Sequence, residues 1–154
     1  MHDSSRTYFE ERVLTAPPER LQFMLIEAAL TAARKAEQLL VAGLPLQANV
    51  ELAQAEAILA EIISGFKKDA AAQLVERTAA VYAFVIRRLT DAHLSGEVQP
   101  VRDAVRVLEV EHETWRLVCE RATASGAIPA PHRAPMPHAE LDNDYASGGF
   151  SAEV

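Results

Sequence analysis

Cysteine, aromatic residues and long apolar runs are all scarce in this chain. The single cysteine, Cys119, cannot form a disulfide within the chain, so we expect a reducing compartment. Only 6% of the residues are aromatic, and this Ala- and Leu-rich composition favours helices. No stretch approaches the roughly 20 consecutive apolar residues of a membrane helix, and the N-terminus lacks the apolar run of a signal peptide. We therefore predict a cytoplasmic protein that does not insert into a membrane.

Positive charge is also in short supply. The formal net charge is -7, and the only basic doublets are Lys67-Lys68 and Arg87-Arg88, both in mixed-charge surroundings. An acidic protein without a concentrated basic patch repels phosphate backbones. We therefore expect no nucleic acid among its partners.

Motifs for catalysis and metal binding are few. No Gly-rich phosphate loop is present. Glu109 and His112 form one E-x-x-H pair, whereas a di-iron bundle needs two such pairs and two further inward glutamates. A metal-binding bundle is therefore only an alternative. Cys119 has no activating histidine and carboxylate in the pattern, so a buried thiol is expected. We predict no catalytic residue, no metal site and no cofactor.

Periodic apolar residues predict four helices joined by short turns. Thr15 with Pro17 or Pro18 is a typical helix start, and Gly43 and Ser95-Gly96 are typical breaks. The lengths and short turns favour an all-α, antiparallel up-down four-helix bundle. The expected helices span about 18–41, 45–64, 70–93, and from Val98 or Pro100 to Thr123.

Each helix carries one apolar stripe that we expect to face the core, and most carry further apolar residues. A wide stripe is normal for a globular helix, but an exposed groove for an amphipathic partner segment explains the surplus equally well. The expected core stripes are Leu21, Leu25, Ala28, Ala32, Ala36 and Leu39; Leu52, Leu59, Ile62 and Phe66; Leu74, Thr78, Val81, Val85 and Ala92; and Val101, Val105, Leu108, His112, Trp115, Cys119 and Ala122.

The chain divides into a bundle and a tail. Residues 1–124 are expected to form the bundle domain, in which residues 1–17 act as an N-terminal cap. Residues 125–154 hold four of the eight prolines and no periodic apolar face. Such a composition predicts a disordered, flexible tail.

The segment from Val13 to Leu25, VLTAPPERLQFML, follows Tyr8 and resembles the N-terminal motif of the flagellin export chaperones, the FliS family. The resemblance continues through 55–62 and 81–93 and includes Trp115, so that it covers about residues 7–122. The family usually continues Met-Leu with Tyr-Asp-Gly, where this chain has Ile26-Glu27-Ala28.

The resemblance implies a four-helix bundle that binds the C-terminal segment of flagellin in the cytoplasm. It would keep that segment from polymerising and deliver it to the flagellar export apparatus, whose gate component would be a second partner. A self-associating structural bundle, present as a homodimer, is another alternative. Surplus apolar residues and the N-terminal cap are the expected partner contacts: Tyr8, Val13, Leu14, Ile58, Ile62, Tyr82, Ile86, Val107, Val110 and Leu117.

Overall fold

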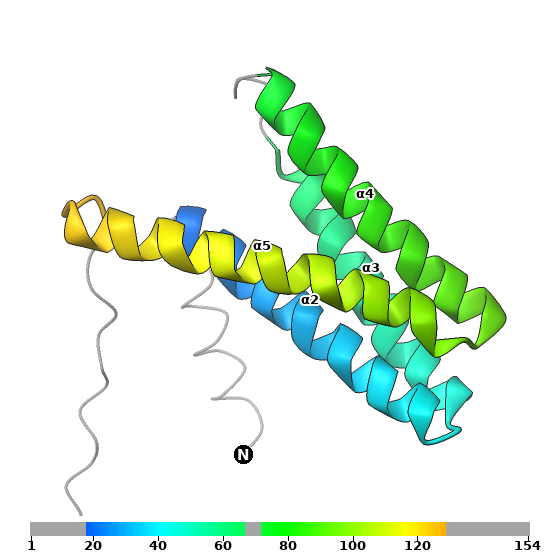
Figure 1. Ribbon diagram of the computed structural model, residues 1–154. Helices are drawn as coiled ribbons and strands as arrows, with labels where there is room; N and C mark the ends of the chain where they lie inside the picture. Colours follow the sequence, from blue (N-terminus) through cyan, green and yellow to red (C-terminus); the bar gives the residue numbers. More distant parts are fainter. Residues whose placement is uncertain (1–17, 67–71, 129–154) are drawn as a thin grey trace, which may run out of the picture.

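A computed structural model describes residues 18–66 and 72–128, which form four helices, α2 (Pro18–Val41), α3 (Pro45–Ser64), α4 (Ala72–Ser95) and α5 (Val98–Ala124). Consecutive helices run antiparallel, and the helices pack in the cyclic order α2, α3, α4, α5 (Figure 1). No strand occurs within these residues. The predicted all-α four-helix bundle is confirmed, while the N-terminal cap and the chain beyond Ile128 lie outside the described residues.

Glycines close α2 and α5. Gly43 has a φ of 74°, and the Leu44 N–H donates to the Leu39 carbonyl at 2.9 Å, a six-to-one bond that satisfies a helix-end carbonyl. Gly126 (φ 73°) closes α5 in the same way. Its turn carries Ile128, which is only 2% exposed. The turn formed by residues 125–128 therefore belongs to the folded bundle, although these residues were grouped with the tail.

The core of α2 follows the expected stripe only in part: Ala32 and Ala36 are buried as predicted, but the first half of the helix is turned. Ile26, Ala29 and Ala33 are fully buried, whereas Ala28 is exposed and Leu25 is only half-buried. Alanine occurs on several faces of this helix and hardly distinguishes one face from another, so periodicity alone could not fix the rotation. Small side chains at the centre let α2 pack closely against both α3 and α5.

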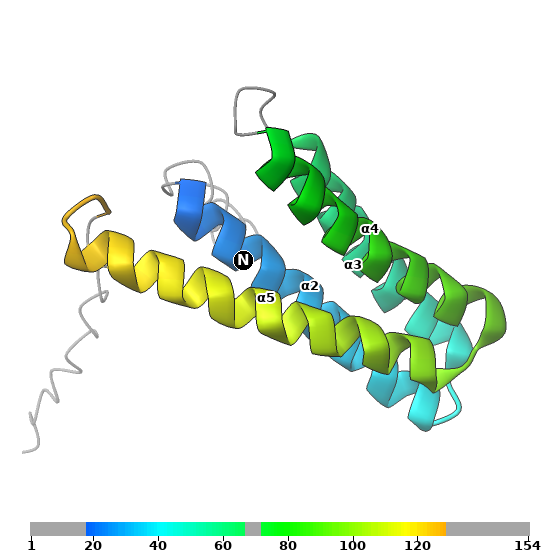
Figure 2. The same cartoon turned by 45° about the horizontal axis from the view of Figure 1, so that its top comes forward.

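The far halves of the helices depart from a uniform bundle. The α2–α5 pair and the α3–α4 pair are close at the end with the two short turns and diverge toward the other end (Figures 1 and 2). Val101, Val105 and Leu108 of α5 are buried as expected. His112 and Trp115, further along the same stripe, are only half-buried. Toward that end of the bundle α4 and α5 diverge (Figure 1).

Ion pairs join neighbouring helices around the bundle. Their side chains are at least partly exposed, so they set the register of the helices more than they stabilise the fold. The pairs between helices are Arg34–Glu109 (2.8 Å), Lys35–Glu51 (2.7 Å), Arg88–Asp103 (2.7 Å) and Arg102–Glu37 (2.9 Å).

Candidate partner-binding surfaces

The outer face of α5 carries an apolar stripe. Val107, Val110 and Leu117 lie on one line, at intervals of three and seven residues. Val110 is 65% exposed and Leu117 39%, while Val107 is half-buried and packs against the core. Val110 and Leu117 lie between two flanks of α5 that make ion pairs, Glu109 toward α2 and Asp103 toward α4. These two side chains therefore face away from the bundle and are available to a partner. Val107 lies on the α4 side of the helix, four residues from both Asp103 and Glu111, and is only partly accessible.

The other expected contact residues are less accessible. Ile58 of α3 and Ile86 of α4 are half-buried and pack against the core. Ile62 is 3% exposed and Tyr82 is fully buried. In this conformation a partner can reach Ile62 and Tyr82 only if neighbouring helices move apart. Outside the described residues lie Tyr8, Val13 and Leu14.

Tyr82 is the centre of a hydrogen-bonded network that joins three helices. Its hydroxyl donates to Oε2 of Glu111 on α5 at 2.9 Å and accepts from Nε2 of Gln22 on α2 at 3.2 Å. The Phe66 ring stacks on the Tyr82 ring at a centroid distance of 6.1 Å. Burial, and next the charge of Glu111, raise the pKa of Tyr82 above its usual range. No sequence pattern pointed to Glu111 or Gln22 as partners of Tyr82.

The two residues of the E-x-x-H pair have separate partners on α2. The carboxylate of Glu109 pairs with Arg34 at 2.8 Å. His112 lies 3.5 Å (Nε2–Oε1) from Glu27, and its ring contacts Phe23 at a centroid distance of 4.8 Å. Nowhere in residues 18–66 and 72–128 do three histidine, cysteine or acidic side chains gather to hold a metal ion.

Cys119 is half-buried and connects α5 to the start of α2. Its thiol donates to the Glu19 carbonyl at 3.4 Å. Burial is the main cause of the raised pKa of the thiol. A thiol that stays protonated is a poor nucleophile. The sequence predicted a buried thiol, whereas this side chain is half-buried.

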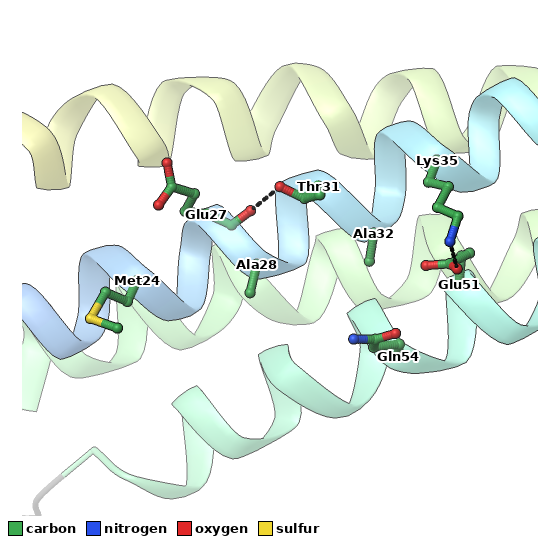
Figure 3. A pocket seen from close by; sticks show the side chains of 8 residues that line it. All are labelled: Met24, Glu27, Ala28, Thr31, Ala32, Lys35, Glu51 and Gln54. Atoms are coloured by element: carbon green, nitrogen blue, oxygen red, sulfur yellow. Dashed lines mark hydrogen bonds and ion pairs between the residues drawn. The ribbon is translucent and has the colours of Figure 1, made fainter. Parts of the chain in front are cut away.

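A shallow groove of about 430 Å³ lies between α2 and α3 (Figure 3). The Lys35–Glu51 ion pair lies toward one of its ends, and the Thr31 hydroxyl donates to the Glu27 carbonyl at 2.8 Å. Two of the three residues that depart from the family motif, Glu27 and Ala28, line this groove, whereas Ile26 lies in the core. Its lining is Met24, Glu27, Ala28, Thr31, Ala32, Lys35, Glu51 and Gln54.

Sequence reasoning missed a second group of exposed apolar side chains, at the end with the short turns. Leu46 and Leu94 are 82% and 83% exposed. A signal was present, since apolar residues adjoin both glycine-containing turns, where no helical periodicity requires burial. The group comprises Val41, Leu44, Leu46, Val50 and Leu94.

Helix length and composition bear on membrane insertion. Within the residues that the structure describes, no helix is both long enough and apolar enough to cross a membrane.

Comparisons with known proteins agree with the N-terminal motif. A crystal structure of a flagellar chaperone from bacteria superposes with a TM-score of 0.64 at 18% sequence identity, covering 76% of this chain and 98% of that one. This likeness shows that the fold is shared. Comparison with curated protein sequences gives no match. The profile of the flagellar protein FliS family matches residues 1–122, so the chain belongs to the FliS family.

Proposed function

We propose that this protein is a cytoplasmic chaperone without enzymatic activity that binds the C-terminal segment of flagellin. It would keep that segment from polymerising prematurely and deliver it to the flagellar export apparatus, where a gate component is a second partner. Membership of the FliS family supports the flagellar chaperone role. The observation that carries the proposal is the exposed apolar stripe of α5.

The stripe has the chemistry of a helix-in-groove contact. Val107, Val110 and Leu117 present aliphatic side chains along three turns of a rigid helix. A client segment that folds on this surface covers apolar area and orders itself at the same time, which gives a large negative heat-capacity change. Ile58 and Ile86 are half-buried and extend the proposed contact to α3 and α4.

The buried candidates require a conformational step. Ile62 and Tyr82 would meet the client only if it separates the diverging helix pairs. The N-terminal cap, with Tyr8, Val13 and Leu14, is proposed to be displaced when the client binds. Each of these contacts adds to Val110 and Leu117 of the α5 stripe, which are exposed without any movement.

Calorimetric titration with a C-terminal peptide of flagellin from the same organism tests the proposal. We expect saturable one-to-one binding to the full chain. Val107→Glu combined with Val110→Glu should weaken binding at least about tenfold, because two charges would be desolvated at the contact. Val50→Glu is the matched control, since Val50 is 67% exposed on α3, as Val110 is on α5.

Two outcomes would contradict the proposal. If the folded protein binds no flagellin peptide, the client is wrong. If Val50→Glu weakens binding as much as the double substitution on α5, the contact surface is wrong. Light scattering on the same samples distinguishes a monomer from the alternative of a self-associating homodimer.

A further inference from the structure

The outward face of α4 carries a stripe that no neighbouring helix covers. Arg77, Ala80, Phe84, Arg87, Asp91 and Leu94 follow one another at intervals of three and four residues, and all are exposed. On one flank Arg88 bonds to Asp103 of α5, and on the other the Thr90 hydroxyl donates to Glu56 of α3 at 2.9 Å. The stripe between these flanks faces solvent.

Basic and aromatic side chains distinguish this α4 stripe. Phe84 is 40% exposed. Neither Arg77 nor Arg87 forms an ion pair with another described residue, whereas Asp91 is paired with Arg88 at 3.0 Å. The two arginines lie ten residues apart, or about 15 Å along the helix. A segment that binds this stripe should therefore carry carboxylates spaced over about the same 15 Å, and apolar side chains that can contact Phe84.

The chain's own C-terminal segment has this chemistry. Residues 129–154 carry one arginine against four carboxylates. Three of these carboxylates, those of Glu140, Asp142 and Asp144, alternate with or adjoin Leu141 and Tyr145. An extended chain covers at most about 14 Å from Glu140 to Asp144, close to the separation of the two arginines on α4.

The point where the described chain ends makes the contact reachable. Ile128 lies in the turn that closes α5, the helix that packs beside α4. The Tyr82–Glu111 bond sets the register of these two helices, so Phe84 lies opposite about residue 109. The axial distance from there to the end of α5 is about 22 Å. The twelve residues between Ile128 and Leu141 extend to about 40 Å.

We propose that residues 139–150 of this chain dock on the α4 stripe, with their carboxylates on Arg77 and Arg87 and their apolar side chains against Phe84. A tethered segment of this length has an effective concentration in the millimolar range, so a weak contact is populated. This inference does not depend on the identity of the client. It assigns the C-terminal segment a contact within its own chain.

Paramagnetic relaxation tests the contact in the full chain. A nitroxide is attached at Ser147→Cys in a Cys119→Ser background, and amide signals are compared with the reduced label. We expect the strongest broadening along residues 80–91. Arg77→Glu combined with Arg87→Glu should lower the docked fraction about fivefold, because two attractions become repulsions. Arg106→Glu on α5, whose side chain is 71% exposed, is the matched control and should leave the broadening unchanged.

Several results would overturn the proposal. These are absent broadening, broadening centred on another helix, or equal loss of broadening in the Arg106→Glu control. Broadening seen only when labelled and unlabelled copies are mixed would assign the stripe to a second copy instead. Circular dichroism verifies that each surface variant keeps its helices, so a folding failure is not mistaken for lost docking.

Discussion

The Tyr82 hydroxyl offers the sharpest test of how the helix pairs are held together. Tyr82→Phe removes only the oxygen that donates to Glu111 and accepts from Gln22. A hydrogen bond to a carboxylate contributes about 1.5–3 kcal/mol to stability. Glu111 is half-buried and water can replace part of the loss, so we expect a decrease of about 1–2 kcal/mol in the free energy of unfolding.

Urea unfolding followed by circular dichroism and by the fluorescence of Trp115 measures this loss. With a slope of about 2 kcal/mol per molar urea, in the middle of the typical range, the midpoint should fall by about 0.5–1 M. Glu111→Gln keeps an oxygen that can accept the bond, so it should cost less than Tyr82→Phe. A double-mutant cycle of Tyr82→Phe with Glu111→Ala, which removes the accepting oxygens, should give a coupling energy of about 1 kcal/mol between the two positions.

The reasoning fails if Tyr82→Phe changes stability by less than about 0.5 kcal/mol, the usual range of an uninvolved surface substitution. It also fails if the effects of Tyr82→Phe and Glu111→Ala simply add. Either result would mean that water satisfies Glu111 as well as the hydroxyl does, and that apolar packing alone joins α4 to α5 at this level.

The remaining predictions concern stability. The pKa of Tyr82 is raised in the folded state, so above pH 10 the folded protein keeps a proton that the unfolded chain loses. The free energy of unfolding of the wild type should therefore fall as the pH rises above 10. Urea melts should show a steeper fall for the wild type than for Tyr82→Phe. Gly43→Ala should lower the free energy of unfolding by about 1 kcal/mol in thermal melts, because Gly43 has a positive φ. Gly65→Ala, where φ is -79°, should be neutral or stabilising. Equal losses for the two variants would contradict this reasoning. Leu108→Ala should cost about 2–5 kcal/mol in urea unfolding, against at most about 0.5 kcal/mol for the exposed Leu94→Ala.

Helix boundaries were predictable where the chain carries backbone signals. Proline and glycine delimit α3, and its predicted bounds, Pro45 and Ser64, are those of the structure. The end of α2 follows from Gly43 in the same way. Local chemistry decides these points, so they need no knowledge of the neighbouring helices.

The rotation of each helix was harder to predict. The apolar residues of α2 cover several faces, so tertiary packing decided that Ile26 is fully buried while Leu25 is only half-buried against the core. Tyr82 was expected at the partner surface but is buried, because Glu111 and Gln22 supply its hydroxyl with partners from two other helices. Such contacts join residues 29 and 60 positions apart, beyond the reach of any periodic pattern.

Because the two helix pairs diverge, a small rotation at the end with the short turns produces a larger displacement at the open end. Both short turns lie at one end, and α5, with 27 residues, extends about 40 Å from its turn. A rotation of about 5° at that end moves the far tip by roughly 3–4 Å, without breaking a hydrogen bond within any helix. A change of a few degrees at the turns is thus amplified at the open end into a displacement of about the width of a side chain.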